Sequence, residues 1–418
     1  MSEAESADRS DQRSFVVVGG GLAGAKAVEG LRERGFGGRV VLLGAEPHLP
    51  YERPPLSKAY LKTGEKLDEA FVHDQEWYDA HNIEVRTSTR VVAVDRDAKT
   101  VRTQDGQQVR YDRLLLTTGA SPRTLSIPGA DLPGVLTLRT IEDSDRIRQV
   151  LREGNRVVFV GGGWIGLEVA SAAAEAGARV TVLEALELPL VRVLGPRIAQ
   201  VFVDLHREHG VDLRTGVTVQ ALEPQEGRPD AVGAVLLGDG TRIPADAVVV
   251  GVGAAPNVQL AEAAGLEVDN GVVADAVGRT SDPDIFVAGD LANAEHPFLG
   301  RRVRVEHWAN ALNQPAVVVA GMLDEAGPQP ELPYFFTDQY DLGMEYTGLA
   351  SAEDDVVVRG DLATREFIAF WLRDGRVTAG MNVNVWDVTE PINALVTSRA
   401  VVDPQRLADQ AVPLEELT

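Results

Sequence analysis

The chain has 418 residues, enough for two or three domains, and its hydrophobic (44%) and charged (25%) fractions are typical of globular proteins. A formal net charge of −23 disfavours binding to nucleic acid or to an anionic membrane over a broad surface, because both would be repelled. The sequence contains no cysteine, which excludes disulfides, thiolate metal sites and cysteine-ligated clusters. Its seven histidines show no H-x-x-x-H spacing, so we expect no metal site.

The N-terminal residues 1–14 are polar and lack an apolar segment, so we expect a flexible tail and not a signal peptide. No run of about 18 apolar residues occurs, so a membrane-spanning helix is not expected. These features predict a cytoplasmic protein.

A glycine-rich pattern occurs twice. Residues 16–35, VVVGGGLAGAKAVEGLRERG, align without a gap with residues 158–177, VFVGGGWIGLEVASAAAEAG. Each spells G-x-G-x-x-G between a β-branched strand and a helix, a turn that brings backbone N–H groups and a helix N-terminus to a pyrophosphate. A single copy could be a packing turn, but two copies in this context predict two dinucleotide sites. The glycines are Gly19, Gly21 and Gly24 in the first copy and Gly161, Gly163 and Gly166 in the second.

The strand after the second turn, RVTVLEA, ends in Glu184. A carboxylate there accepts hydrogen bonds from the 2′-hydroxyl of an adenosine ribose and repels a 2′-phosphate. No cation follows it closely, so the second site should prefer NADH to NADPH, unless Glu184 is simply a solvated strand end. In the first copy Gly44 takes the position of the acid, and Glu46 is our candidate for the ribose.

Three further segments indicate the architecture. Residues 112–119 (DRLLLTTG) and 246–253 (DAVVVGVG) are strands of the buried type that end at glycines, where we expect the chain to pass between two nucleotide domains. Residues 282–291 (DPDIFVAGDL) run from a strand into a glycine–aspartate turn. Together with the two turns, these segments resemble the two-dinucleotide flavoprotein oxidoreductases of the glutathione-reductase structural class.

This resemblance covers nearly the whole chain and implies an α/β fold with two Rossmann-like dinucleotide-binding domains plus a C-terminal α/β domain. FAD would be bound by residues 15–120 and 249–330, and NADH by residues 121–248, a domain inserted into the first. Residues 331–418 would form the C-terminal domain.

Three longer motifs narrow the family. LPYERPPLSK (49–58), VRVEHWANALNQ (303–314) and FFTDQYDLGMEYTG (335–348) resemble the FAD-dependent ferredoxin reductases of bacterial oxygenase systems, the group of putidaredoxin reductase and biphenyl-dioxygenase reductase. The resemblance implies an enzyme that passes electrons singly from NADH through flavin to an iron–sulfur ferredoxin serving a monooxygenase or dioxygenase. The same segments resemble rubredoxin reductase and apoptosis-inducing factor, so a rubredoxin acceptor and an NADH-sensing interaction protein stay open. A quinone reductase is disfavoured, because neither end of the chain shows a basic amphipathic helix.

The missing cysteines agree with a one-electron acceptor. Members of this class that reduce disulfides or peroxides relay electrons from flavin to a cysteine thiol. Without sulfur, electrons must leave the flavin directly, and a flavin can release them one at a time.

The resemblance assigns the catalytic pair. Lys58, which closes PPLSK, corresponds to a lysine beside the flavin N5 edge, and Glu168, in GLEVA, to the glutamate that pairs with it near the nicotinamide. A cation there stabilises negative charge as the ring accepts hydride, and the carboxylate orients the cation. Without the resemblance, a surface salt bridge would be the better interpretation.

The resemblance also assigns cofactor contacts. Asp290 would face a polyol hydroxyl near the ribityl chain, and Trp308 would contact the flavin from a helix that starts after Glu306 and that Pro315 should kink or weaken. The dipole of that helix would favour the anionic reduced flavin. The remaining predicted contacts are Ala23, Arg53, Val91, Thr118, Gly119, Arg139, Gly289 and His307 for FAD, and Ile165 and Gly253 for NADH.

Two departures from the family are visible. Ala45 stands where several relatives carry an acid, and Phe335 and Phe336 stand where relatives often carry tryptophan. The second change puts a specific aromatic relay to the cluster in doubt while leaving apolar docking possible.

The ferredoxin partner is typically acidic, which conflicts with a net charge of −23. We expect Arg301, Arg302 and Arg304 to contribute to a local basic patch, because the alternation Arg302–Val303–Arg304–Val305 predicts a strand with its cations on one face. The alternative is that these arginines are simply solvated.

Overall fold

The protein is described here by a computed structural model covering residues 11–64 and 67–417. Its chain divides into two compact units. Of the described residues, unit 1 takes those within 1–52, 68–121 and 255–331, and unit 2 takes those within 53–67, 122–254 and 332–418. The sequence predicts that residues 53–67 belong with the first glycine turn, whereas the structure groups the described residues of this range with the second.

Unit 1 is built on a five-stranded parallel sheet in the order β19-β7-β1-β2-β3. Alternate residues of its central strand face opposite sides, so Phe15 and Val17 enter one hydrophobic cluster and Val16 and Val18 another. Burial on both faces explains why the strands read as unbroken apolar runs. The strands are β1 (Ser14–Val18), β2 (Arg39–Leu43), β3 (Ile83–Arg86), β7 (Arg113–Leu116) and β19 (Ile285–Val287).

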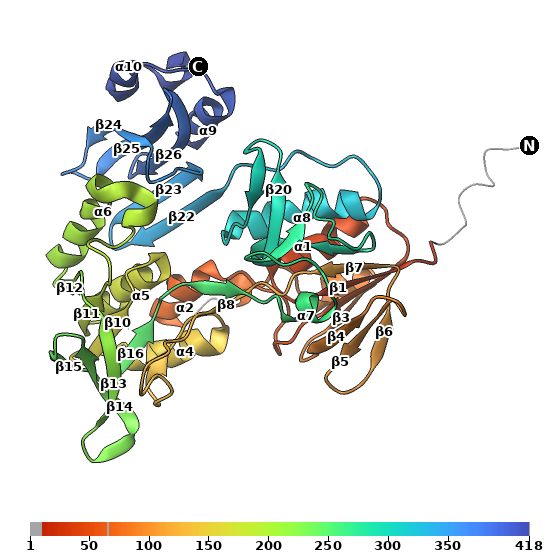
Figure 1. Ribbon diagram of the computed structural model, residues 1–418, viewed down its shortest axis with the longest axis horizontal. Helices are drawn as coiled ribbons and strands as arrows, with labels where there is room; N and C mark the ends of the chain where they lie inside the picture. The colour runs from red at the N-terminus through yellow and green to blue at the C-terminus, as the bar shows by residue number, and fades with distance from the viewer. Residues whose placement is uncertain (1–10, 65–66, 418) are drawn as a thin grey trace, which may run out of the picture. The chain divides into compact units, whose positions relative to one another are not determined.

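Helices α1 and α8 pack together over the first face of this sheet (Figure 1). Two small sheets, ordered β4-β5-β6 and β18-β20-β21, contribute to the cluster on the other face. The helices of unit 1 and the strands of its two small sheets are α1 (Leu22–Glu33), α3 (Gln75–Ala80), β4 (Val91–Asp95), β5 (Thr100–Thr103), β6 (Gln108–Arg110), α7 (Gln259–Ala263), β18 (Val272–Ala274), β20 (Ala292–His296), β21 (Arg301–Val303) and α8 (Trp308–Met322).

Unit 2 contains a second five-stranded parallel sheet, in the order β12-β11-β10-β16-β9. Its two faces are again buried, one by helices α5 and α6 and the other by the antiparallel sheet β13-β14-β15. The elements are α2 (Ala59–Thr63), β9 (Val135–Leu136), α4 (Ile141–Val150), β10 (Arg156–Val160), α5 (Trp164–Glu175), β11 (Arg179–Leu183), α6 (Val191–Glu208), β12 (Asp212–Arg214), β13 (Val219–Gln225), β14 (Arg228–Leu237), β15 (Arg242–Pro244) and β16 (Ala247–Val250).

The two units repeat one plan. The strand–turn–helix of residues 14–33 corresponds element by element to that of residues 156–175, and both helices have 12 residues. The sheet orders correspond as well, and each unit inserts a three-stranded antiparallel sheet before the strand that follows. The predicted pair of Rossmann-like domains is confirmed. Two of the points at which the chain passes between the units lie within the short strands β8 (Ala120–Pro122) and β17 (Ala254–Pro256).

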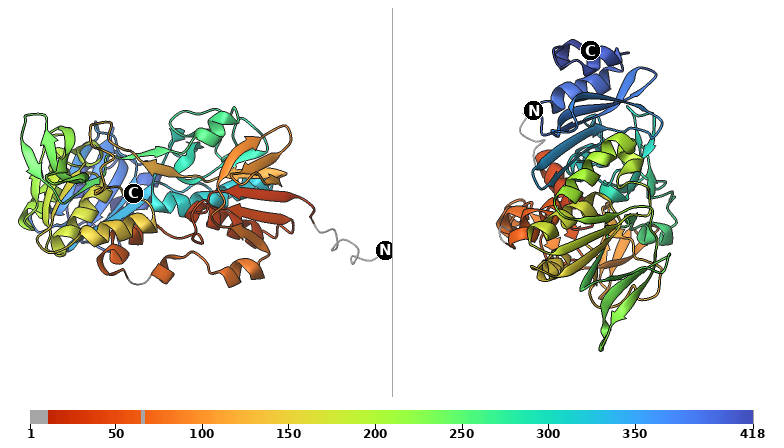
Figure 2. Two further views of the ribbon diagram at one scale, coloured as in Figure 1. Left: turned by 90° about the horizontal axis from the view of Figure 1, so that it is seen from below. Right: turned by 90° about the vertical axis from the view of Figure 1, so that its left-hand side faces the viewer.

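The C-terminal part of unit 2 is an antiparallel sheet in the order β22-β23-β26-β25-β24 with two short helices beside it (Figure 2). Its apolar face joins the same cluster as helix α5, so this sheet packs on the helix that follows the second glycine turn. The elements are β22 (Tyr334–Gln339), β23 (Leu342–Gly348), β24 (Asp355–Asp361), β25 (Glu366–Arg373), β26 (Arg376–Val383), α9 (Thr389–Ser398) and α10 (Pro404–Ala408).

Three local expectations need comment. Of the predicted tail, residues 1–10 lie outside the described residues, and Ser14 already belongs to β1. Helix α8 continues through Pro315, and the prediction that this proline kinks the helix or weakens one turn stays a prediction. The interruption that occurs is in α6, where Gly195 is non-helical before Pro196. Among the described residues, no helix is long and apolar enough to cross a membrane.

Candidate active site and cofactor sites

The first glycine turn is shaped by two close approaches. Gly19 has φ +131°, and a Cβ on it would overlap the backbone of Thr117. A Cβ on Gly24 would overlap the carbonyl oxygen of Gly19. By contrast, a Cβ on Gly21, the N-cap of α1, would meet no atom within 4 Å. The helix start is therefore open for a ligand, while the other two glycines let strand and helix pack.

The second turn has the same construction. Gly161 has φ +103° and lies against the backbone of Gly251, and Gly166 lies against Gly161. Gly163, the N-cap of α5, has only one atom near the position of a Cβ, at 3.7 Å. Ile165, in the first helical turn, leaves half of its side chain exposed. This open helix start suits a pyrophosphate as well as the first one does.

Glu184 follows strand β11 and contacts the second turn directly. Its carboxylate accepts the backbone N–H of Gly162 at 2.8 Å and that of Leu186 at 2.8 Å. The side chain is thus held at the edge of the glycine turn and is not a free strand end, although its contact with a ribose remains a prediction.

The end of the first sheet gathers several predicted FAD contacts within unit 1. A Cβ on Gly289 (φ +74°) would lie 3.1 Å from that of Ala23, and the Gly289 N–H donates to Gln314 at 2.7 Å. Thr118 and Asn257 exchange two hydrogen bonds, of 3.1 and 2.7 Å. Gly119 accepts the backbone N–H of Asn257, Gly253 accepts that of Arg123 within unit 2, and Val91 is buried at the start of β4.

The start of helix α8 brings three more of them together. His307 is its N-cap, and burial lowers the His307 pKa to about 4 although nearby Asp290 acts to raise it. The imidazole is therefore neutral at pH 7. Trp308, the first helical residue, donates its indole N–H to Glu52 at 3.2 Å. The sequence motif had placed these residues in one site, and the fold of unit 1 brings them close.

Three predicted FAD contacts have protein partners of their own. Glu46 accepts a hydrogen bond from the hydroxyl of Tyr51, which fixes the carboxylate two residues beyond Gly44. Arg53 donates to the carbonyl oxygen of Arg139, so these two lie together. Both arginines belong to unit 2, not to the unit that carries the first glycine turn.

The predicted catalytic pair forms within unit 2. The ammonium of Lys58 lies 2.6 Å from Glu168 Oε1, and the exposed fractions of the two side chains are 19% and 6%. Glu168 stands on α5 among apolar residues, so an unpaired carboxylate would carry a large desolvation cost there. Lys58 also lies 5.3 Å from the centre of the Phe336 ring.

Two partners of Glu168 were missed from sequence. Ser57 donates to Glu168 Oε2 at 2.6 Å and Thr337 donates to Oε1 at 2.6 Å, so the carboxylate accepts three hydrogen bonds. Ser57 is the neighbour of Lys58 in a recognised motif, which was an available signal. Thr337 is 169 residues from Glu168, and only the packing of β22 on α5 brings it there.

The arginine motif is only partly as predicted. Strand β21 ends at Val303, and Arg304 turns inward, donates to the carbonyl of Asp290 at 3.2 Å and pairs with Glu306. Its side chain is 12% exposed, so the prediction that it extends a one-sided cationic strand was wrong. Arg301 and Arg302 are exposed, and Arg302 lies 3.5 Å from Glu295.

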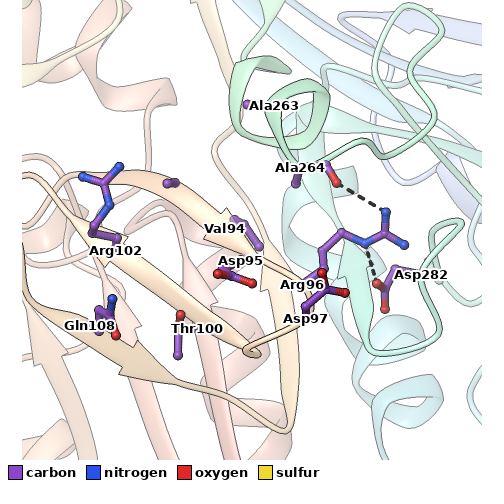
Figure 3. A pocket seen from close by; sticks show the side chains of 11 residues that line it. Val94, Asp95, Arg96, Asp97, Thr100, Arg102, Gln108, Ala263, Ala264 and Asp282 are labelled. Atoms are coloured by element: carbon purple, nitrogen blue, oxygen red, sulfur yellow. Dashed lines mark hydrogen bonds and ion pairs between the residues drawn. The ribbon is translucent and has the colours of Figure 1, made fainter.

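A polar pocket of 680 Å³ lies elsewhere in unit 1, between β4–β5 and α7 (Figure 3). Arg96 spans it, bonded to Asp282 at 2.7 Å and to the carbonyl of Ala264 at 3.3 Å. Among the described residues, none of the predicted cofactor contacts lines this pocket, so we assign it no part in the chemistry.

The fold and the site define a class of protein. In each of two Rossmann-like sheets a strand leads into a glycine turn with an open helix start, and Glu168 on the helix of the second turn forms a largely buried pair with Lys58. This is the arrangement of a two-dinucleotide oxidoreductase, whose cofactors fit both turns.

Comparison with known proteins identifies the family. Residues 13–314 match the model of the pyridine nucleotide-disulphide oxidoreductases, and residues 334–418 match the reductase C-terminal model. The chain belongs to the pyridine nucleotide-disulphide oxidoreductase family. The predicted relationship is confirmed.

Individual relatives match over nearly their full length. The chain is 40% identical to putidaredoxin reductase CamA of Pseudomonas putida, with 97% of this chain and 96% of the relative covered. It is 42% identical to the ferredoxin–NAD(+) reductase component of the anthranilate 1,2-dioxygenase system of Burkholderia cepacia, with 96% and 98% covered. The crystal structure of the covalent putidaredoxin reductase–putidaredoxin complex contains a chain that matches with a TM-score of 0.94 at 40% identity, covering 97% of this chain and 98% of that one.

Proposed function

We propose that the protein is an FAD-dependent NADH:ferredoxin oxidoreductase, which passes electrons singly from NADH through flavin to an iron–sulfur ferredoxin of an oxygenase system. The observation that carries the proposal is the largely buried pair of Lys58 with Glu168, which stands on the helix of the second glycine turn, in a chain that has no cysteine. The relatives named as ferredoxin reductases of oxygenase systems support the same function.

The cofactors are FAD and NADH. When bound, FAD would supply a group that can accept hydride from NADH and release the electrons one at a time. The first turn, with Gly19, Gly21 and Gly24, would hold the FAD pyrophosphate, and the second would hold that of NADH. Glu184 would accept a hydrogen bond from the ribose hydroxyl of NADH. It would also keep the turn in place by accepting the backbone N–H of Gly162.

Lys58 and Glu168 act through electrostatics. The ammonium stabilises the negative charge that develops during hydride transfer, and the carboxylate keeps the ammonium in one position. Because both groups are largely withdrawn from water, their field is stronger than that of an exposed pair.

The absence of cysteine restricts the acceptor. This chain offers no thiol to take electrons from flavin, so its chemistry differs from that of the disulfide reductases that name the family. A diffusing one-electron carrier is the acceptor that suits it. We also place the protein in the cytoplasm.

The test uses purified protein loaded with FAD, NADH, and either a [2Fe–2S] ferredoxin or a rubredoxin in separate assays. We expect rapid bleaching of the ferredoxin over many turnovers. Faster reduction of rubredoxin than of ferredoxin would show that the acceptor is a rubredoxin and not a ferredoxin. A long-lived complex of NADH with the flavoprotein that changes its oligomeric state, without turnover, would favour an NADH sensor.

A further inference from the structure

A chain of buried hydrogen bonds leads away from the Lys58–Glu168 pair. The amide of Gln339 donates to Thr337 Oγ1 at 3.2 Å, and its oxygen lies 2.9 Å from Nε2 of His206. His206 Nδ1 lies 3.4 Å from the hydroxyl of Tyr340. Thr337, Gln339 and His206 are all completely buried. Strand β22 therefore connects Glu168 on α5 with His206 on α6.

The proton positions along this chain follow from the partners. A carboxylate can only accept hydrogen bonds, so the Thr337 hydroxyl donates a hydrogen bond to Glu168. Its oxygen must then accept the hydrogen bond from the amide of Gln339. The Gln339 oxygen is then left to accept from His206 Nε2–H, which makes His206 Nδ1 the acceptor for Tyr340. Every donor points toward Glu168.

A neutral His206 is what this order requires. Burial lowers the pKa of His206 to about 4, so the ring carries no charge at pH 7. A protonated ring would have to donate from Nδ1 and reverse the contact with Tyr340.

This series of hydrogen bonds is suited to orienting the Glu168 carboxylate and not to conducting protons. Gln339 gives one hydrogen bond and takes one, but an amide does not readily lose or gain a proton near neutral pH. Its rigidity comes from the strand: Thr337 and Gln339 are two residues apart and share one face of β22.

We propose that Thr337, held by Gln339 and His206, is a positioning residue that fixes the Glu168 carboxylate and thereby the Lys58 ammonium for hydride transfer. The C-terminal sheet thus helps to set the rate of flavin reduction in addition to covering α5. This inference rests on the proposed function, since it assigns a role within the same site.

The test compares Thr337→Val with Thr337→Ser in the FAD-loaded full chain. Valine keeps the shape and removes the hydrogen bond, whereas serine restores it. We expect Thr337→Val to lower the limiting rate of flavin reduction by NADH about tenfold with little change in NADH affinity. The FAD reduction potential should become more negative, by about 30 mV if stabilisation of the two-electron reduced state weakens tenfold.

Thr337→Ser should recover most of the rate and of the potential. Gln339→Met, which leaves the Thr337 hydroxyl in place but unsupported, should cost less, about threefold in rate. Thr347→Val serves as the matched control. It removes another buried hydroxyl, on the neighbouring strand β23, that is not part of this series of hydrogen bonds.

The outcomes separate this inference from the proposed function. If NADH fails to reduce the flavin of the wild-type protein, the proposed function is overturned. Wild-type activity with a Thr337→Val variant of unchanged rate and potential would overturn the positioning role alone. Equal losses in Thr337→Val and Thr347→Val would also overturn it, because they would show general loosening of the sheet.

Discussion

At the scale of single residues, the carboxylates of the two predicted sites are already hydrogen-bonded within the protein. Glu184 accepts two backbone N–H groups, and Glu168 accepts three hydrogen bonds. Each carboxylate is therefore fixed in position before a cofactor arrives, which reduces the entropy lost on binding.

Glu184 should determine nucleotide preference. Replacing it with glutamine keeps the shape but removes the charge that repels a 2′-phosphate and weakens acceptance from the ribose. We expect the ratio of kcat/KM for NADH over NADPH to fall at least tenfold in Glu184→Gln. Steady-state kinetics with both nucleotides measure it, and Glu187→Gln, an exposed neighbour, is the control. An unchanged ratio would remove Glu184 from the ribose site.

His206 should make the folded protein sensitive to acid. Its pKa is lowered from 6.5 to about 4, mainly by burial, so the unfolded chain binds the proton more readily. Stability from this group is therefore complete above pH 6.5 and is lost as the pH falls toward 4. At pH 5 the loss is about 2 kcal/mol.

Thermal unfolding at pH 7 and pH 5 measures this loss. The wild-type midpoint should fall further between these values than that of His206→Gln, which cannot titrate but can still donate to Gln339. Equal decreases in the two proteins would show that His206 is not held neutral.

At the scale of elements, the predictable parts were those with local signals. The strand–turn–helix units follow from glycine spacing and apolar strands, and they fall where expected. What the sequence could not show was contact between distant elements. Thr337 meets Glu168 because β22 packs on α5, and Arg304 turns inward because the carbonyl of Asp290 and the carboxylate of Glu306 attract it.

Strand β21 makes a prediction about partner binding. Arg301 and Arg302 are exposed, whereas Arg304 is occupied within unit 1. If the first two attract an acidic ferredoxin, changing both to glutamate should raise the KM for ferredoxin about tenfold and leave flavin reduction by NADH unchanged. Stopped-flow and steady-state assays separate the two steps, with Arg110→Glu, an exposed charge on β6, as control. Equal behaviour of the two variants would exclude β21 from docking.

At the scale of the whole molecule, the chain uses one plan twice and adds a sheet. The fold class was predictable because each copy carries its own signal. The unit to which residues 53–64 belong was not predictable, because the contacts of this segment with α4 and α5 are non-local. That segment brings Lys58 to Glu168, so the proposed catalytic pair lies within the unit of the second turn.

The most direct test of the account is an anaerobic titration of the FAD-loaded protein with NADH in the presence of excess oxidised ferredoxin. The account predicts one bound FAD per chain and two ferredoxins reduced for each NADH consumed, with no added thiol. A protein that stays colourless after incubation with FAD, or a flavin that NADH reduces but that passes nothing to a one-electron carrier, would contradict it.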